Sequence, residues 1–191
     1  MRLRLLFVLL MLAIAVPFAS ADTILDLNVT NVAGYTHTLI GTVDLHQVST
    51  GVVQVTLTAQ PGFSFKLSGG DVMFNTSASL VTGKNSPSIS GISYLTLASN
   101  GPAPFGKFNY DLRNLSGGVN ATTITFLVSA NNLTVADFGS FGVHFCVGTS
   151  GCALTGFAAT TGTAVPEPGT LSLLGTGIVG LAGFFRRRLL S

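Results

Sequence analysis

The chain has 191 residues, which fits one domain with short appendages, and 47% of its residues are apolar while only 8% are charged. Between Asp22 and Val165 four basic residues stand against six aspartates, a balance of 4 − 6 = −2. This part of the chain has no cluster of Lys and Arg for phosphate contacts, which argues against a nucleic-acid partner.

Residues 1–21 are predicted to be a signal peptide. Arg2 and Arg4 form a basic start, and residues 5–16 form an apolar stretch that is too short to span a bilayer comfortably. The small residues at 19–21 fit the subsites of signal peptidase, which places the cut between Ala21 and Asp22. An uncleaved anchor is the alternative. We therefore expect the mature chain to be exported into an oxidising compartment.

Residues 22–160 are predicted to form one all-β domain, an antiparallel β-sandwich, because apolar and polar residues alternate along them. Turn-like clusters, among them residues 100–104, separate the alternating runs, and many short runs at this spacing are typical of sandwiches. Only residues 131–140 could hold a helical turn, and residues 161–168 form a linker. The clearest alternating runs are residues 52–59, 63–67, 105–113, 122–128 and 140–147. In the run 105–113, one face is expected to carry Phe108, Tyr110 and Leu112, and the opposite face Lys107, Asn109, Asp111 and Arg113.

The two cysteines, Cys146 and Cys152, are predicted to form a disulfide. If residues 148–150 are the loop of a hairpin, Val147 pairs with Gly151 and Cys146 lies opposite Cys152, near enough for a bridge. Two free thiols are the alternative. The same register matches residues on the inner face, pairing Phe145 with Ala153, Val143 with Thr155 and Phe141 with Phe157.

Motifs for catalysis or for cofactors are weak. Residues 101–107 fit the spacing of a phosphate-binding loop, but Phe108 replaces the Ser or Thr that would hold Mg²⁺. His37, His46 and His144 lack the spacing of a metal-binding helix. We therefore expect no enzyme activity, no catalytic residue, no cofactor and no metal. A secreted hydrolase, which would need acids and histidines converging in one cleft, is an alternative.

Residues 169–188 are predicted to form a single transmembrane helix with a cationic end. No charge occurs from Leu171 to Phe185. As a helix this stretch reaches about 22 Å, short of a hydrocarbon core of about 30 Å. Arg186, Arg187 and Arg188 would hold this end in the cytoplasm as a stop-transfer cluster and leave the domain outside. Residues 189–191 are a short tail, and an ordinary tail anchor is the alternative.

The last part of the chain, "VPEPGTLSLLGTGIVGLAGFFRRRLLS", closely resembles the PEP-CTERM sorting signal of Gram-negative bacteria. The resemblance implies that an exosortase, a membrane transpeptidase with a cysteine nucleophile, reads Pro166, Glu167 and Pro168. It also implies that the apolar span and the Arg cluster hold the chain in the membrane until this enzyme acts. The same signal is also labelled an ice-binding protein C-terminal domain, a label that shows no ice binding by itself.

Together these features predict an exported, non-enzymatic protein of the cell surface or extracellular matrix. Its partners would be signal peptidase, the membrane, an exosortase-type transpeptidase and, from the setting of the family, exopolysaccharide. We expect an intermediate anchored in the inner membrane, which is later delivered to the surface. The leading alternative is a carbohydrate- or ice-binding module, and a flat array of Thr on one sheet face would favour ice. Thr residues alternate in the runs 56–59 and 122–126, but no regular repeat sustains an array.

Overall fold

The computed structural model describes residues 22–67, 71–115, 120–149 and 151–161. The predicted signal peptide, transmembrane helix and tail lie outside these residues, together with most of the linker. Ala21, the triplet 166–168 and the arginines 186–188 are therefore not described. Within the described ranges, no helix is both long enough and apolar enough to span a membrane.

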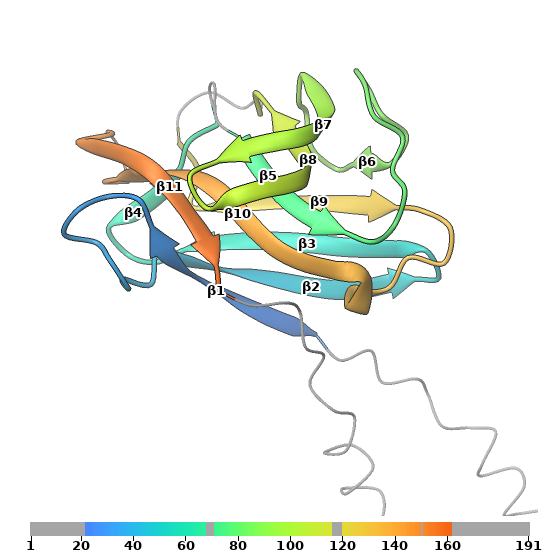
Figure 1. Ribbon diagram of the computed structural model, residues 1–191, viewed down its shortest axis with the longest axis horizontal. Helices are drawn as coiled ribbons and strands as arrows, with labels where there is room; N and C mark the ends of the chain where they lie inside the picture. The colour runs from blue at the N-terminus through green and yellow to red at the C-terminus, as the bar shows by residue number, and fades with distance from the viewer. Residues whose placement is uncertain (1–21, 68–70, 116–119, 150, 162–191) are drawn as a thin grey trace, which may run out of the picture. The chain divides into compact units, whose positions relative to one another are not determined.

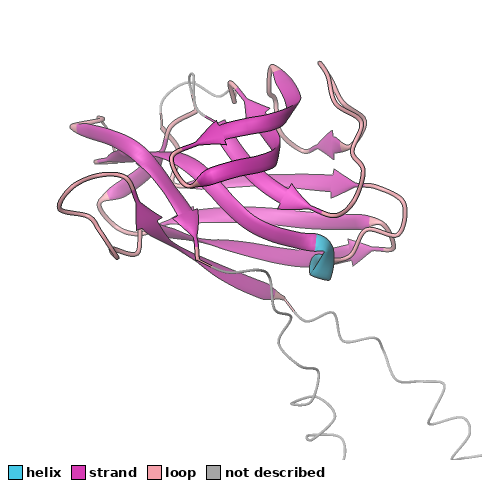
Figure 2. Ribbon diagram, in the orientation of Figure 1, coloured by secondary structure: helices cyan, strands magenta, loops and turns pink. Residues whose placement is uncertain are grey.

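The described residues fold into eleven β-strands and one 3-10 turn, which confirms the prediction of an all-β domain (Figure 2). The turn, η1 (Val135–Asp137), lies in the segment 131–140 where the sequence allowed a helical turn. The strands are β1 (Thr23–Thr30), β2 (Gly41–Ser49), β3 (Val52–Ala59), β4 (Phe63–Phe65), β5 (Asp71–Thr76), β6 (Ile89–Ser90), β7 (Thr96–Ala103), β8 (Gly106–Arg113), β9 (Thr123–Ser129), β10 (Phe138–Val147) and β11 (Leu154–Thr160).

All strand pairs are antiparallel, and they form one sheet that bends round one large core. The order is β6-β9-β3-β2-β1-β11-β10-β5-β8-β7, so β1 and β11 join a layer around β2 and β3 to a layer around β10 and β5 (Figure 1). The short strand β4 pairs with β10. On its other side, the backbone of Phe65 pairs with Ala121, just before β9, which nearly closes the sheet.

The alternation of side chains explains how each strand sits in the sheet. Along β3, Val53, Val55 and Leu57 are fully buried, while the residues between them face outward. Aromatic rings then join the two layers. The ring of Phe74 on β5 lies 6.3 Å from that of Phe126 on β9, although these strands share no hydrogen bonds. The core is therefore shared by both layers.

The hairpin of β2 and β3 turns through Thr50 and Gly51. Gly51 has a φ of +78°, a conformation that L side chains rarely adopt. A Cβ atom at this position would also lie 2.6 Å from the carbonyl oxygen of Ala130. Only glycine fits this turn, because the turn packs directly against the segment that follows β9.

The register predicted for the hairpin of β10 and β11 is wrong, although the disulfide predicted together with it is present. Cys146 and Cys152 form a disulfide with their Cα atoms 5.0 Å apart. Cys146 lies opposite Thr155, however, and Cys152 lies in the loop before β11. Phe145 faces Gly156, not Ala153, because the side chain of Val32 fills the space beside Gly156.

The tip of the β7–β8 hairpin also differs from expectation. Residues 100–104 were expected to be a turn, but β7 runs through Ala103 and the turn is Pro104–Phe105. A proline is tolerated at position 102 because β7 is the last strand of the sheet. Phe108, expected to share a face with Leu112, instead packs with Met73 and Ala159 in a second, smaller cluster.

Candidate functional site

The outward side chains of four adjacent strands, β1, β2, β3 and β9, form a mostly polar surface, which is interrupted by Ile24 and Leu127 and which we call the polar face. Its rows follow from the register of the three strand pairs. The first row contains Asp26, Thr42, Thr58 and Thr123. The second row contains Ile24, Asp44, Thr56 and Thr125. The third row contains His46, Gln54 and Leu127, with Asp22 beside His46.

The threonines of the polar face present hydroxyl groups to solvent. Thr56 and Thr125 share a hydrogen bond, with 3.3 Å between their Oγ1 atoms. Among the described residues, the hydroxyls of Thr42, Thr58 and Thr123 have no hydrogen-bond partner, so they are free to contact a ligand. The sequence showed alternating Thr in two separate runs. It did not show that these runs become neighbouring strands.

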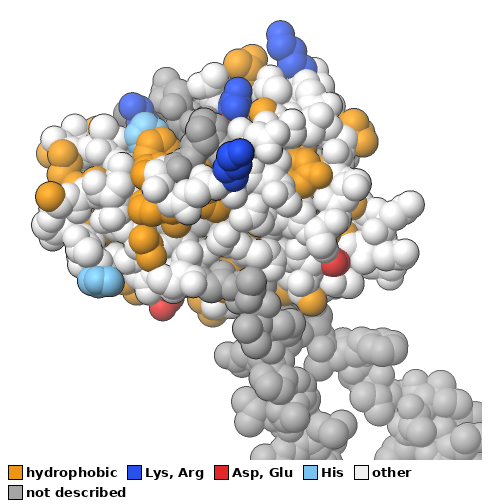
Figure 3. All heavy atoms as spheres, in the orientation of Figure 1, with side chains coloured by type: hydrophobic (Ala, Val, Ile, Leu, Met, Phe, Trp, Pro, Cys, Tyr) orange, Lys and Arg blue, Asp and Glu red, His pale blue; other side chains and the backbone are white. Residues whose placement is uncertain are grey.

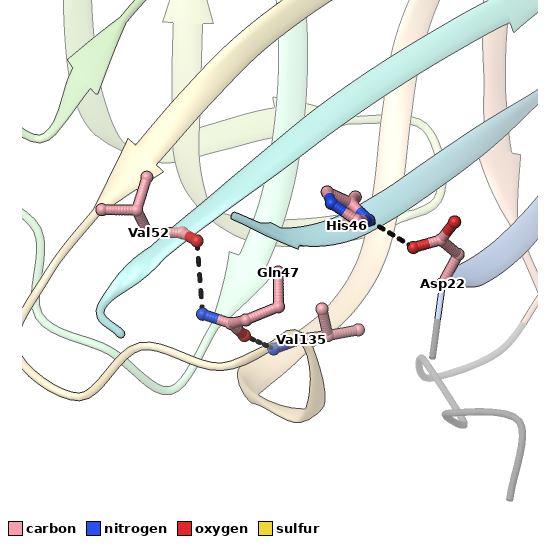
Figure 4. A network of polar contacts seen from close by, with 5 residues as sticks. All are labelled: Asp22, His46, Gln47, Val52 and Val135. Atoms are coloured by element: carbon pink, nitrogen blue, oxygen red, sulfur yellow. Dashed lines mark hydrogen bonds and ion pairs between the residues drawn. The ribbon is translucent and has the colours of Figure 1, made fainter. Parts of the chain in front are cut away.

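One corner of the polar face carries two carboxylates and an imidazole. The Oδ1 atom of Asp22 lies 2.5 Å from Nδ1 of His46, and both side chains are about half exposed (Figure 4). Burial raises the pKa of the neighbouring Asp44, and the charge of Asp22 raises it further, while His46 acts in the opposite direction. The Oδ1 atom of Asp44 is buried and has no hydrogen-bond partner among the described residues.

Basic residues are absent from the four strands of the polar face. The polar face carries Asp22, Asp26 and Asp44, and the four strands that form it contain neither Lys nor Arg. The basic residues of the described domain, Lys66, Lys84, Lys107 and Arg113, all lie outside these strands. Figure 3 shows a surface that is mostly uncharged, with Lys and Arg gathered in its upper half.

A glutamine fixes the end of the polar face to the segment after β9. The Nε2 atom of Gln47 lies 2.7 Å from the carbonyl oxygen of Ser49, 3.2 Å from that of Val52 and 3.0 Å from that of Leu133. Its Oε1 atom accepts a hydrogen bond of 3.1 Å from the N–H of Val135 (Figure 4). Nothing in the sequence pattern marks Gln47, because its partners lie as far as 88 residues away.

Two shallow grooves flank this segment, and uncharged side chains line both. One of about 410 Å³ lies between the loops that contain Val81, Pro87 and Ala130. The other, of about 400 Å³, is bounded by Gln47 and Leu133. Apolar, hydroxyl and amide groups line these grooves, so the grooves can contribute packing and hydrogen bonds.

The histidines considered in the sequence lie on three different elements of the fold. His37 is in the loop between β1 and β2, His46 is on the polar face, and His144 is on β10. The ring of His144 stacks on Phe157 with 4.6 Å between centroids, and its Nε2 atom lies 2.6 Å from the hydroxyl of Thr155. In the described part of the chain, no three His, Cys, Asp or Glu residues are grouped so that they could hold a metal ion.

One buried carboxylate was not expected. Strand alternation placed Asp111 on an outward face of β8, but the residue is only 2% exposed, between Met73 of β5 and Ala98 of β7. Burial raises the pKa of Asp111, and the guanidinium of Arg113, 2.6 Å away, opposes this effect. This pair lies outside the polar face, in the other layer of the sheet.

Comparison with known proteins identifies the C-terminal segment. Residues 164–188 match the family model of the PEP-CTERM protein-sorting motif, which confirms the resemblance. This range includes Pro166, Glu167, Pro168 and the arginines 186–188. No curated protein matches the chain. The chain therefore carries a PEP-CTERM sorting signal, which marks it for export, for processing at the membrane by an exosortase-type system and for delivery toward the cell surface.

Proposed function

We propose that the β domain is a non-enzymatic binding module that associates with exopolysaccharide after the chain has been sorted. The observation that carries this proposal is the polar face, on which three rows of hydroxyl, amide and carboxylate groups span four strands. Polysaccharides present repeated hydroxyl groups, which both donate and accept hydrogen bonds. A surface of free Thr hydroxyls and carboxylates offers matching partners.

The spacing of the polar face supports an extended ligand. Neighbouring strands lie about 4.8 Å apart, and outward residues along one strand recur about every 6.8 Å. The groups of the polar face therefore form a grid across β1, β2, β3 and β9. Such a grid favours a long polymer, which gains affinity from many weak contacts, over a small substrate held for reaction.

The proposed route to the cell surface uses both ends of the chain. Signal peptidase removes residues 1–21, and the helix 169–188 holds the intermediate in the inner membrane with Arg186, Arg187 and Arg188 in the cytoplasm. The exosortase-type enzyme then reads the triplet 166–168 and releases the domain. The matched motif supports this route, because it contains the triplet, the apolar span and the Arg cluster in one segment.

One experiment distinguishes a binding module from a secreted hydrolase. Exopolysaccharide from the producing bacterium is sedimented with the secreted protein, and release of new reducing ends is followed in the same sample. We expect co-sedimentation without release, and weaker co-sedimentation for Thr58→Val, because a free hydroxyl is lost from the middle of a row. Thr96→Val on β7 is the matched control outside the polar face. Release of reducing ends by the wild type would support a secreted hydrolase instead.

A second candidate is an ice-binding module, and one observation favours it. Thr42, Thr58 and Thr123 form a row of three hydroxyls across neighbouring strands, with Thr56 and Thr125 in the next row. Asp44 and His46 interrupt the array on β2, which favours a carbohydrate. A measurement of thermal hysteresis, the difference between the melting and freezing temperatures of the solution, distinguishes the two candidates. Thermal hysteresis that Thr58→Val abolishes would support ice binding.

A further inference from the structure

We infer that the two grooves beside residues 129–134 form a binding site for a neutral saccharide, separate from the polar face. The first, which we call the loop groove, is lined by residues of the loop 79–88 and by residues 129–131. The second, which we call the hairpin groove, is lined by residues of the β2–β3 hairpin and by residues 132–134. The inference goes beyond the proposed function, because no residue that lines either groove belongs to the rows of the polar face.

The first argument is the absence of charge. Among the described residues, only apolar, hydroxyl and amide side chains line the two grooves. Lys84 belongs to the same loop as Val81, but it is not one of the residues that line the loop groove. A charged sugar would find no counter-ion in either groove, and burying a charge without a partner costs free energy. The lining therefore favours a neutral sugar over a uronic acid or an amino sugar.

Hydrogen bonds hold the walls of the loop groove in a fixed shape. The N–H of Val81 donates to Oγ of Ser88 at 3.0 Å, and the hydroxyl of Ser86 donates to the carbonyl oxygen of Val81. The carbonyl oxygen of Ser88 accepts from the N–H of Ser129 at 2.9 Å, which ties the loop to the other wall. The groove is thus formed before a ligand arrives, so binding costs little conformational freedom.

Val81 presents an apolar side chain that the fold does not cover. The residue is 57% exposed, although both of its backbone polar groups are bonded within the protein. Pro87, which is also exposed, lines the same groove. A pyranose ring has an apolar face of C–H groups and an edge of hydroxyls. Val81 and Pro87 can pack against this face and remove apolar surface from water.

Two neighbouring asparagines supply polar groups, one to each groove. Asn131 lines the loop groove and Asn132 lines the hairpin groove, and both residues are exposed. Neither side chain has a hydrogen-bond partner in the described part of the chain. A side-chain amide both donates and accepts hydrogen bonds, as a sugar hydroxyl does. Because the two asparagines are adjacent, an oligosaccharide that crosses this turn contacts both grooves.

The hairpin groove is also fixed by internal contacts, and its size matches that of the loop groove. Gln47, which lines it, bonds to the carbonyl oxygen of Leu133 at 3.0 Å, and the N–H of Ala130 donates to the carbonyl oxygen of Gly51 at 3.0 Å. The volumes are about 400 Å³ and 410 Å³. Both lie within the range of about 300–1,000 Å³ that is usual for ligand sites. Together the grooves suit a short stretch of a sugar chain.

Five hexasaccharides test the inference on the full secreted chain. The hexamers of glucose, mannose and N-acetylglucosamine are neutral, and those of galacturonic acid and glucosamine are charged. They are titrated calorimetrically in a mildly acidic, low-salt buffer. We expect at least one neutral hexamer to bind more tightly than both charged hexamers, with an affinity that added salt leaves unchanged, because no ion pair is formed.

Two variants locate the bound hexamer. Asn131→Ala should weaken its binding about fivefold, the effect of one lost hydrogen bond between neutral groups. Val81→Asp should weaken it by more than about tenfold, because an unpaired carboxylate replaces an apolar contact. Leu154→Asp is the matched control, since Leu154 is an exposed apolar residue on β11 that lines neither groove. Thr58→Val, on the polar face, should leave binding of the hexamer unchanged.

The inference is overturned if no neutral hexamer binds, or if a charged hexamer binds as tightly as the best neutral one. It is also overturned if Val81→Asp and Leu154→Asp weaken binding equally. Loss of binding in Thr58→Val but not in Val81→Asp would place the saccharide on the polar face, which overturns this inference and supports the proposed function. If no hexamer binds while native exopolysaccharide still co-sediments, this inference fails and the proposed function stands.

Discussion

The hydroxyl oxygens of Thr56 on β3 and Thr125 on β9 lie 3.3 Å apart, although 69 residues separate them in the sequence. This contact exists because β9 returns to pair with β3 along its whole length, from Val52 opposite Ser129 to Thr58 opposite Thr123. Two short Thr-containing runs thus become one surface. The polar face is therefore a product of topology, and its integrity depends on the loops that hold β9 in place.

Gln47→Ala should lower the free energy of unfolding by about 2–3 kcal/mol, because several backbone groups, most of them part-buried, lose their partners. The two N–H groups of this side chain serve the carbonyls of Ser49, Val52 and Leu133, and its Oε1 atom accepts from Val135. Urea denaturation followed by far-UV circular dichroism measures the change.

The control for this variant is Gln54→Ala on β3. Gln54 has the same side chain but faces outward on the polar face, and a substitution there should change stability by less than about 0.5 kcal/mol. Equal losses for both variants would mean that Gln47 does not join the hairpin of β2 and β3 to the segment after β9.

Removing the disulfide should lower stability by about 2 kcal/mol, the entropy of closing a loop with a sequence separation of 6. The double variant Cys146→Ala, Cys152→Ala should show this loss, and reductant should destabilise the wild type but not the variant. Mass analysis without reductant should find the two cysteines linked within one chain. Two thiols that alkylate readily in the native protein would contradict the bond.

The strands that alternation predicted best are those whose residues meet water on one side and the core on the other. The run 52–59 coincides with β3, because Val53, Val55 and Leu57 alternate with polar residues and nothing interrupts the pattern. The sequence allowed a helical turn at η1 for a similar local reason. The sequence there leaves the alternating pattern, and Asp137 caps the turn by accepting hydrogen bonds from Thr134.

Register and curvature could not be predicted, because distant residues decide them. At Gly156 an added Cβ atom would lie 2.1 Å from Cγ2 of Val32, a residue in the loop after β1. The register of β10 and β11 therefore depends on a contact with another part of the chain. Similarly, Phe108 reaches the outer side of β10, where a Cβ atom on Gly142 would lie 2.9 Å from its ring.

Asp137 should contribute stability at neutral pH that is lost in acid. Hydrogen bonds from the hydroxyl of Ser77 and from the backbone and hydroxyl of Thr134 hold the pKa of Asp137 below its usual range. A lowered pKa in the folded state stabilises the fold above the unfolded value of about 3.9, and this contribution disappears as the pH falls through the folded value.

The variant Asp137→Asn tests this dependence on pH. It should unfold at lower urea concentration than the wild type at neutral pH, and the gap should narrow as the pH is lowered below about 3.9. Ser77→Ala should show a smaller gap with the same trend, because it removes only one donor to the carboxylate. A gap of constant size at every pH would mean that the charge of Asp137 is not what stabilises η1.

Secreted protein should begin at Asp22. In the fold this residue directly precedes β1 and already contacts His46, so the predicted cleavage site lies at the very edge of the folded domain. Replacing Ala19 and Ala21 by Phe should block the cut, because the peptidase requires small residues at these two subsites. Ser20→Phe, between them, should still be cut. Mass spectrometry that finds residues 1–21 on the secreted wild type would refute the prediction.

Glu167→Ala should block processing of the C-terminal signal and leave export intact. The apolar span and the three arginines remain in this variant, so the unprocessed chain should stay in the membrane fraction with its domain outside. The residue lies within the matched sorting motif, residues 164–188. Thr170→Ala, in the same motif but outside the Pro-Glu-Pro triplet, is the control and should be processed like the wild type.

Deleting residues 186–188 should have a different effect, because these arginines act as a barrier and not as the recognised triplet. Each Arg at the centre of a bilayer costs about 2.5–3.5 kcal/mol, and this cost is what stops transfer of a short apolar span. Without the arginines the chain should pass through the membrane and be released uncut, with Glu167 and Ser191 both retained. This outcome differs from that of Glu167→Ala in the location of the uncut chain, which is released here but stays in the membrane fraction for Glu167→Ala. Analysis of the C-terminal peptide shows in both cases whether the chain was cut.

If both variants are processed like the wild type, the segment does not act as a sorting signal. If the wild type keeps Ser191 in the membrane of a host with an active exosortase, the segment is an ordinary tail anchor.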